Sequence, residues 1–223
     1  GTAALTAGVA GCTGILQNGT DEESAGTPTT SLPYSEDFED GSLNDYQIVP
    51  IAGDDDTESY HVTSEPSRGE YAVKHRTESR YLAPRTDVAL APPLTFSLDF
   101  FVEGWSGIDI VLQHDASRDL TYLVKVRDNN NGPFVELSKN RNELAAADSE
   151  TLVTDRNENN VFTPRAWETV EIDWESDGTI TAAIPSSAES VSITDTDLSG
   201  HPFRLRGYHY DGSATIDNIE IRR

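Results

Sequence analysis

The chain has 223 residues and a formal net charge of −23, which comes from 39 acidic and 16 basic residues. All-β sandwiches of about 200–250 residues fold as single units, so the length predicts one domain with a sizeable core and a tail. The acidic balance argues against nucleic acid or an anionic membrane surface as a partner, and the single cysteine excludes an internal disulfide.

The acidic residues are spread along the chain, while lysine is confined to Lys74, Lys125 and Lys139. A dispersed acidic coat predicts a surface that stays soluble by self-repulsion. The pattern resembles proteins of salt-loving archaea, in which about 1 M salt screens such repulsion beyond roughly 3 Å. An ordinary acidic extracellular protein is the alternative interpretation.

The first segment, residues 1–11, is small and mildly apolar and carries no charged side chain. It is too short to span a membrane, which needs about 20 residues, so we interpret it as part of a signal peptide. Val9-Ala10-Gly11-Cys12 resembles the lipobox of bacterial and archaeal lipoproteins, which implies cleavage before Cys12 and a lipid on its sulfur. The segment also resembles a twin-arginine signal, whose arginine pair would lie upstream. A chance sequence in a flexible tail is the alternative.

Residues 12–33 follow as a linker rich in Gly, Ser, Thr, Pro and acidic residues, which cannot bury a core. We expect it to tether a lipidated Cys12 to a folded domain, so that the protein is extracellular and held at the cell membrane. Asn18-Gly19-Thr20 is an N-glycosylation sequon, which makes Asn18 a candidate modification site.

From Tyr34 onward, apolar residues fall at every second position, which predicts strands with one buried face. The alternating runs are 94–102, 108–112, 120–126, 134–137, 170–174, 180–184, 203–205 and 216–221. Turn signals lie at 128–132, 176–178 and 210–212, and 142–148 fits a single helical turn. Many short strands with polar turns predict an all-β, two-sheet antiparallel sandwich over 34–223.

Four motifs, in order, resemble the concanavalin-like, laminin-G-like jelly-roll superfamily. They are Tyr34–Gly41 (YSEDFEDG), Arg68–Val73 (RGEYAV), Trp167–Trp174 (WETVEIDW) and Ala214–Ile221 (ATIDNIEI). The resemblance implies a jelly-roll sandwich. It leaves function open, because this fold hosts lectins, adhesion modules, glycosidases and lyases.

A catalytic alternative rests on Glu171, Asp173 and Glu175, which resemble the E-x-D-x-E strand of laminarinases and lichenases. The resemblance implies Glu171 as nucleophile, Glu175 as acid/base and Asp173 between them. On a regular strand the Cα atoms of Glu171 and Glu175 would be about 13 Å apart, and the tryptophan-rich substrate-binding segments of those enzymes are absent. The polar outer face of a non-catalytic strand is the simpler interpretation.

The resemblance also implies a structural calcium ion that joins the first and last strands. The matching positions are Asp37, Glu39, Asp40 and Asp217. Calcium takes 6–8 oxygen ligands, of which these segments could supply several. The alternative is that they are hydrated surface acids.

A third candidate is a glycan-binding surface on the exposed face of one sheet, because sugars are held by planar polar side chains and an aromatic platform. The main candidates are Asp99, Phe101, Trp105, Gln113, Arg127, Arg206 and Tyr208. Lys125, Asp173 and Arg204 fall on the same face of the alternation. Trp105, in a glycine-flanked loop, would be the platform, unless it belongs to the core.

Three functions are therefore open. The first is a lipid-anchored surface protein that binds carbohydrate or another surface polymer without catalysis. The second is a secreted polysaccharide hydrolase or lyase that uses Glu171 and Glu175. The third is a structural envelope protein without a small ligand. A deep cleft over Glu171 and Glu175 would favour the second.

Overall fold

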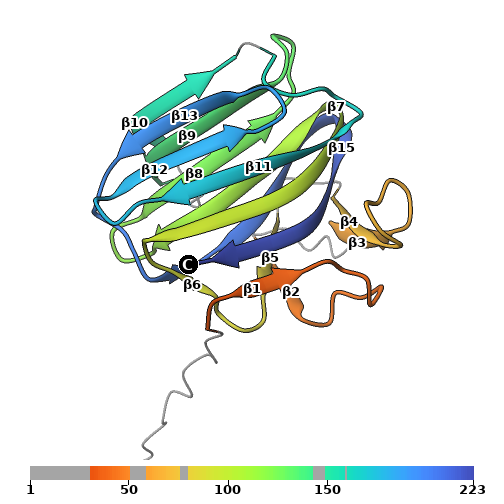
Figure 1. The fold of residues 1–223 in the computed structure, drawn as a ribbon, viewed down its shortest axis with the longest axis horizontal. Coiled ribbons are helices and arrows are strands. Elements are labelled where there is room, and N and C mark those ends of the chain that lie inside the picture. The colour runs from red at the N-terminus through yellow and green to blue at the C-terminus, as the bar shows by residue number, and fades with distance from the viewer. Residues whose placement is uncertain (1–30, 51–58, 76–79, 143–148, 159) are drawn as a thin grey trace, which may run out of the picture.

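The computed structural model describes residues 31–50, 59–75, 80–142, 149–158 and 160–223. Within these ranges the regular secondary structure consists of strands (Figure 1). The strands are β1 (Tyr34–Glu36), β2 (Tyr46–Pro50), β3 (Tyr60–Thr63), β4 (Ala72–His75), β5 (Arg80–Pro84), β6 (Ala89–Leu90), β7 (Leu94–Asp115), β8 (Leu120–Arg127), β9 (Phe134–Arg141), β10 (Glu150–Asn157), β11 (Trp167–Trp174), β12 (Thr179–Ile184), β13 (Glu189–Thr194), β14 (His201–Pro202) and β15 (Arg204–Arg222). The all-β prediction is confirmed.

Several sequence predictions lie outside the described residues. They are the signal segment 1–11, the lipidation site Cys12, the glycosylation site Asn18 and the helical turn expected within 142–148, of which only Asn142 is described. Among the described residues, none belongs to a helix with the length and hydrophobicity of a membrane span.

Two long strands, β7 and β15, pair with each other along most of their length and run through both layers of the sandwich. The first half of β7 pairs with β11, and its second half pairs with β8. We call the layer of β10, β9, β8, the second half of β7, the first half of β15, β5 and β2 the β8 sheet. The layer of β13, β12, β11, the other halves of β7 and β15, and β1 is the β11 sheet.

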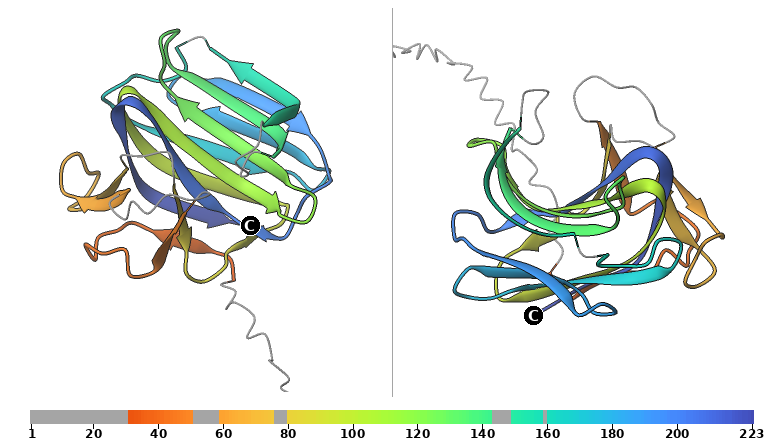
Figure 2. Two further views of the ribbon diagram at one scale, coloured as in Figure 1. Left: turned by 180° about the vertical axis from the view of Figure 1, so that it is seen from behind. Right: turned by 90° about the horizontal axis from the view of Figure 1, so that it is seen from above.

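The right-hand view of Figure 2 shows the two sheets as curved layers, one above the other. The β8 sheet is hollowed on the side that faces away from the β11 sheet, and we call this its concave face. Alternation along each strand decides which side chains reach it. In β8, for example, Tyr122 and Val124 belong to the core, whereas Leu123 and Lys125 point to the concave face.

The core between the sheets is built from the alternating apolar residues that the sequence indicates. Phe96, Leu98 and Phe100 of β7 are fully buried. Tyr122 of β8 and Trp174 of β11 meet across the sandwich with ring centroids 6.1 Å apart in an edge-to-face arrangement. Such aromatic pairs add about 0.5–1.5 kcal/mol beyond the area they bury.

Glycines allow β7 and β15 to bend together from one sheet to the other. Gly104 has φ of +70°, and a Cβ there would lie 2.1 Å from the carbonyl oxygen of Asp211. A Cβ on Gly212 would lie 1.9 Å from the carbonyl oxygen of Glu103. The sequence indicated a loop around Trp105 and a turn at 210–212. Both expectations are wrong, because these residues form the bends of two continuous strands.

Candidate functional site

The exposed aromatic side chains gather where β7 and β15 bend. Trp105 is 44% exposed and Tyr210 is 69% exposed, and their ring centroids lie 5.5 Å apart at an interplanar angle of 36°. Together with Tyr208 and the amide side chains of Asn129 and Asn130 they line a pocket of about 270 Å³. We call this the aromatic pocket. Its lining combines three aromatic side chains with two amide side chains that can donate and accept hydrogen bonds.

The aromatic pocket adjoins an ion-pair cluster on the concave face. The guanidinium of Arg127 lies over the Tyr208 ring, 4.0 Å from its centroid. Tyr208, Gly107 and Arg127 stand opposite one another on three neighbouring strands. A Cβ on Gly107 would come within 2.6 Å of the Arg127 Cγ. The missing side chain at Gly107 therefore lets Arg127 reach Tyr208 across the intervening strand.

Asp109 holds this cluster together and is fully buried. Arg127 donates to its two oxygens from Nε at 2.7 Å and from Nη2 at 2.5 Å. Arg206 donates to Oδ2 from Nε at 2.8 Å and from Nη2 at 2.6 Å. Burial alone would raise the pKa of Asp109, but the guanidiniums of Arg127 and Arg206 outweigh it and hold the pKa well below its usual range.

Opposite charges alternate across five strands of the concave face. The row is Arg206, Asp109, Lys125, Glu136 and Arg156, each opposite the next in the strand register. Its length is about 19 Å, because neighbouring strands lie about 4.8 Å apart. Glu136 accepts from Lys125 and from Arg156, both at 3.0 Å. The row ends where Arg156 lies 3.8 Å from the centroid of the Phe134 ring.

Buried apolar side chains lie beside these charges: Val111 and Leu123 stand opposite each other, and Tyr81 stands opposite Arg206. Tyr81, Val111 and Leu123 form a second hydrophobic cluster, separate from the core, with Val49 packed against it. Val111 and Leu123 are fully buried although they point to the concave face. Val111 and Leu123 are therefore not accessible to a ligand, whereas Trp105 and Tyr210 at the aromatic pocket are.

The seven residues expected on a glycan-binding surface are divided by the structure. It brings together Trp105, Arg127, Arg206 and Tyr208. Asp99 and Phe101 instead lie on the outer face of the β11 sheet. There Asp99 accepts a hydrogen bond from the Thr169 hydroxyl at 2.5 Å, and the ring centroids of Phe101 and Trp167 are 5.8 Å apart. Alternation places all of them opposite buried positions, but it does not say that β7 changes sheets between Phe101 and Trp105.

Gln113 is fully buried and has a structural role. Its amide nitrogen donates to the carbonyl of Leu90 at 3.0 Å, and its oxygen accepts the N–H of His201 at 2.8 Å. It thereby ties the β6–β14 pair to β7 and is not presented to a ligand.

Asp109, Asn129, Asn130 and Tyr210 were missing from the sequence-based site. Asn129 and Asn130 carried only a turn signal, as did Tyr210, and Asp109 was seen only as a polar position between apolar ones. The charge pattern in cross-strand register would have identified Asp109, but register is not readable from one sequence.

The three carboxylates of the catalytic alternative lie at the outer face and end of the β11 sheet. Asp173 is exposed and accepts from the Thr95 hydroxyl at 2.8 Å. Glu175 follows the end of β11 in a tight turn, where its N–H donates to Thr179 at 2.8 Å. A pocket of about 170 Å³ touches Asp173 and Glu175 but is not lined by Glu171. Glu171 and Glu175 therefore do not share one regular strand or one pocket.

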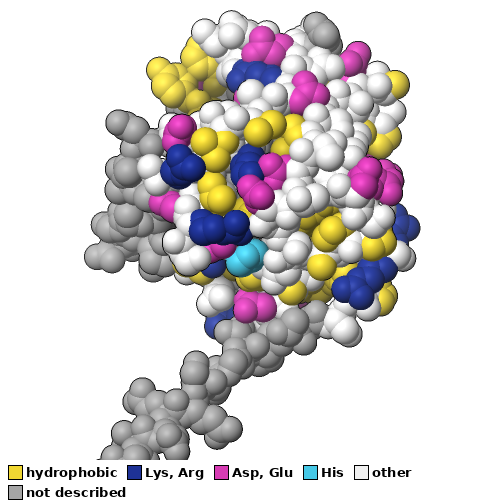
Figure 3. Space-filling view, turned by 90° about the vertical axis from the view of Figure 1, so that its left-hand side faces the viewer, with side chains coloured by type: hydrophobic (Ala, Val, Ile, Leu, Met, Phe, Trp, Pro, Cys, Tyr) yellow, Lys and Arg dark blue, Asp and Glu magenta, His cyan; other side chains and the backbone are white. Residues whose placement is uncertain are grey.

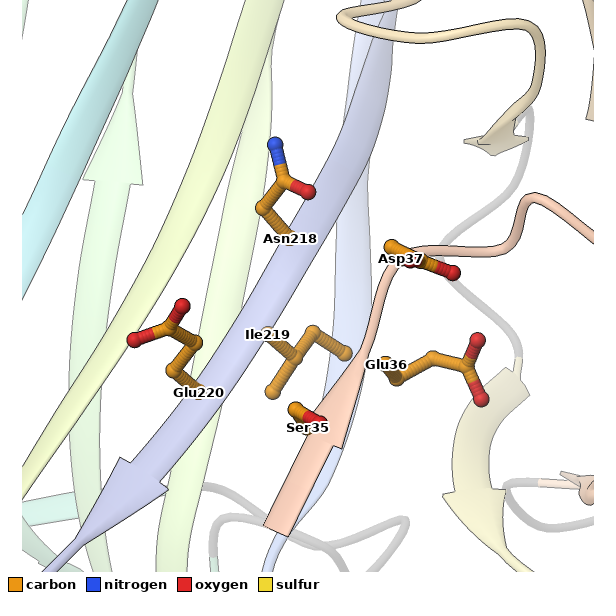
Figure 4. A pocket seen from close by; sticks show the side chains of 6 residues that line it. All are labelled: Ser35, Glu36, Asp37, Asn218, Ile219 and Glu220. Carbon is orange, nitrogen blue, oxygen red and sulfur yellow. The ribbon is translucent and has the colours of Figure 1, made fainter.

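The four carboxylates expected to bind calcium also separate. Asp40 accepts from the N–H and hydroxyl of Ser42, both at 2.8 Å, and Asp37 accepts from the N–H of Glu39 at 3.2 Å. In the pocket of Figure 4, Asp37 and Glu36 point away from Glu220 on the neighbouring strand. Asp37 and Asp40, two of the expected calcium ligands, thus accept hydrogen bonds within local turns.

Glu39 and Asp217 do converge, on the segment that follows Arg68. Glu39 accepts from the N–H of Glu70 at 2.9 Å, and Asp217 accepts from the N–H of Arg68 at 3.0 Å. Burial raises the pKa of Asp217, and the negative charges of Glu39 and Asp99 add to the rise. In the described part of the chain, no three acidic, histidine or cysteine side chains are placed to hold a metal ion. Of the four carboxylates named for calcium, Glu39 and Asp217 lie near each other, and the calcium site stays a prediction.

The acidic coat is not uniform. Figure 3 shows basic, acidic and hydrophobic side chains intermingled on the side of the molecule that lies at the left of Figure 1. Ion pairs such as Arg141–Glu150 at 2.9 Å and Arg156–Glu158 at 2.6 Å neutralise part of the acidic charge locally. Because charges are neutralised locally, the residues that line a pocket say more about which ligand it can bind than the net charge of the chain does.

Comparison with known proteins supports the fold. No family model matches the chain, and no curated protein matches it. A β-glucanase from Bacillus licheniformis superposes with a TM-score of 0.58 at 9% identity, covering 87% of this chain and 100% of the glucanase. The carbohydrate-binding module CBM66 from Bacillus subtilis gives a TM-score of 0.53 at 13% identity, covering 79% and 95%.

A third solved structure, described as a native glycosidic hydrolase, gives a TM-score of 0.53 at 8% identity and covers 86% of this chain and 96% of its own. The chain therefore has the two-sheet sandwich fold of these carbohydrate-active proteins. Identities this low show the fold alone, so function has to be argued from the side chains.

Proposed function

We propose that this chain is a carbohydrate-binding domain without catalytic activity, and that sugar binds at the aromatic pocket. The observation that carries the proposal is the exposed Trp105–Tyr210 pair next to the amides of Asn129 and Asn130. Trp105 and Tyr210 are outside the hydrophobic core clusters and leave much of their surface in water, so a partner surface is the simplest reason for their exposure.

The chemistry of the pocket suits a sugar ring. The C–H faces of a pyranose pack on aromatic rings, and amide side chains both donate to and accept from its hydroxyl groups. Tyr208 is held in place by the Arg127 stack, and Arg127 by Asp109. A surface fixed before binding loses little side-chain entropy when the ligand arrives.

The positions of the carboxylates favour binding over hydrolysis. A retaining glycosidase needs two carboxyl groups about 5–5.5 Å apart, and an inverting one needs them about 6.5–9.5 Å apart. The aromatic pocket is lined by no carboxylate among the described residues. The pocket near Asp173 and Glu175 lacks an aromatic platform of comparable exposure, since Trp174 is buried.

We further propose that the domain is displayed outside the cell through a lipid on Cys12. The support is the Val9-Ala10-Gly11-Cys12 motif and the acidic, proline-containing linker behind it. Substitution Cys12→Ser in cells that export the protein should move it from the membrane fraction to the medium. If the variant stays with the membrane, the anchor proposal is wrong.

Binding of the full chain to a polysaccharide panel tests the central proposal, with release of reducing ends measured in parallel. Trp105→Ala should weaken binding at least tenfold, since stacking aromatics dominate such sites. Phe101→Ala, an aromatic change on the other sheet, should leave it unchanged. Release of reducing ends that disappears in Glu171→Gln would instead establish the hydrolase alternative.

A further inference from the structure

We infer that the aromatic pocket selects acidic polysaccharides, with the anionic group of a uronic acid or sulfated sugar bound by Arg127 at the edge of the pocket. This inference rests on the proposed carbohydrate binding and names the class of sugar. It adds a charge requirement to the proposed carbohydrate binding.

The lining of the pockets distinguishes this site from the rest of the surface. Four other pockets of the described structure are each lined by at least two carboxylates: Glu36, Asp37 and Glu220 in one, Asp173 and Glu175 in another, Asp155 and Glu158 in a third, and Glu36 and Asp45 in a fourth. The aromatic pocket has none, although the chain carries 39 acidic residues. Carboxylates repel an anion at contact distance, and only two of those four pockets also contain an arginine, Arg223 and Arg156. The aromatic pocket has no carboxylate in its lining.

Arg127 supplies the matching positive charge. Its Nε and Nη2 are bonded to Asp109, whereas Nη1 makes no hydrogen bond to any described residue. The side chain is 16% exposed and lies on Tyr208, which lines the pocket. A ligand anion at Nη1 would therefore make a charge-assisted hydrogen bond, the strong class of such bonds.

The buried position of Asp109 supports a binding role for the cluster. Two arginines and one carboxylate cost much desolvation, and hydrophobic residues of similar size often stabilise a fold as well or better. What the ion pairs add is a guanidinium fixed in one orientation beside an aromatic surface. Asp128 and Asp211 are close in sequence, but their side chains do not line the pocket.

The experiment compares the full chain on three polymers in 1 M KCl, where the long-range repulsion from a protein of charge −23 is screened. The polymers are polygalacturonate, the same polymer with its carboxyl groups reduced to alcohols, and a sulfated galactan. The variants are Arg127→Gln, which leaves Asp109 paired with Arg206, and Arg222→Gln as a matched control on an exposed arginine of the β11 sheet.

We expect at least one acidic polymer to bind about tenfold more tightly than the reduced polymer, as one charge-assisted contact would give. Arg127→Gln should abolish this preference and retain the affinity for the neutral polymer, while Arg222→Gln should keep it. Preference for the uronate or for the sulfate identifies which anion the site takes. The ratio of wild-type affinities for the acidic and the reduced polymer is measured without any variant. It therefore tests the preference for acidic polymers even if Arg127→Gln fails to fold.

Equal affinity of the wild type for polygalacturonate and its reduced form, with no gain for the sulfated polymer, overturns the inference and leaves carbohydrate binding standing. The same holds if Arg127→Gln keeps the preference. Absence of binding to every polymer, or binding that Trp105→Ala leaves unchanged, overturns the proposed function itself.

Discussion

A carboxylate that is fully buried, as that of Asp109 is, loses several kcal/mol of hydration energy that only its partners can replace. Asp109 receives four hydrogen bonds from Arg127 and Arg206. The same bonds orient Arg127 on Tyr208. At the scale of single residues, the stability of the concave face and the geometry of the aromatic pocket therefore depend on one side chain.

Asp109→Asn should lower the free energy of unfolding by about 3–5 kcal/mol at pH 7, because it removes the buried carboxylate that the guanidiniums of Arg127 and Arg206 share. The folded pKa of Asp109 is depressed, so its contribution is present above the unfolded value of about 3.9 and is lost as the pH falls below it. Urea unfolding at several pH values measures this.

The difference between wild type and Asp109→Asn should thus shrink toward acid pH. Asp173→Asn is the control, since Asp173 is exposed and accepts one hydrogen bond from Thr95. It should change stability by less than about 0.5 kcal/mol. A similar small effect of Asp109→Asn would mean that the ion-pair cluster is not formed in solution.

At the scale of elements, the bends of β7 and β15 create the site, since they place Trp105 and Tyr210 side by side. Gly104 and Gly200 both have positive φ, +70° and +80°, but only Gly104 lacks space for a Cβ. Gly200→Ala should cost about 1–2 kcal/mol from the backbone conformation alone, and Gly104→Ala about 2–5 kcal/mol because the clash adds to it.

Thermal or urea unfolding of the two variants separates the cost of the backbone conformation from the cost of the clash. The conformational cost is common to both variants, and the clash occurs only in Gly104→Ala. Gly104→Ala should also weaken carbohydrate binding, whereas Gly200→Ala should not. Equal destabilisation by the two substitutions would show that the strands do not approach as closely as the structure has them.

Calcium remains a prediction at the junction of the first and last strands. The pKa of Asp217 is raised by burial and by the nearby negative charges of Glu39 and Asp99, of which Asp99 is paired with Arg68 at 3.2 Å. A cation there would relieve this repulsion, with backbone carbonyls completing the 6–8 oxygens. We expect added Ca²⁺ to raise the unfolding temperature of the wild type but not that of Asp217→Asn, measured calorimetrically after treatment with a chelator. An identical shift in both would place any bound calcium elsewhere.

The sequence predicts individual strands better than their connections. Alternation identifies the buried faces of β7, β8, β11 and β12, since a period of two depends only on which side meets the core. It misses β10, an edge strand whose residues are mostly exposed. Alternation also divides β7 and β15 at their glycines. A strand bend where two backbones approach closely has the same local composition as a turn, so the sequence does not tell them apart.

The same limit applies to the candidate site, whose single residues are easier to predict than their arrangement. Arg127, Arg206 and Tyr208 could be predicted because their residue types suit a sugar and their positions alternate with core residues. Trp105 could be predicted because it is an aromatic residue flanked by glycines. Asp99 and Phe101 satisfy the same criteria and lie on the other sheet. Only the cross-strand register, which depends on the whole fold, separates the two groups and adds Asp109 to the first.

For the molecule as a whole, the dominant electrostatic term at neutral pH is self-repulsion from a net charge of −23. Folding brings these charges closer together than in the unfolded chain, so repulsion destabilises the compact state. Salt shortens the screening length from about 10 Å at 0.1 M to about 3 Å at 1 M. The row from Arg206 to Arg156 is largely buried and in direct contact, so salt weakens it much less than it weakens the repulsion.

The free energy of unfolding should therefore rise steadily as KCl increases from 0.1 to 2 M at pH 7, measured by urea unfolding. Salt also acts on water and on apolar surfaces, and pH separates the two effects. Near pH 4.3, the isoelectric point of the sequence, the net charge and its repulsion vanish while the apolar surface is unchanged. The increase in the free energy of unfolding with KCl concentration should then be small. An equal slope at both pH values would assign the salt response to hydration and would remove the physical basis for interpreting the acidic composition as an adaptation to high salt.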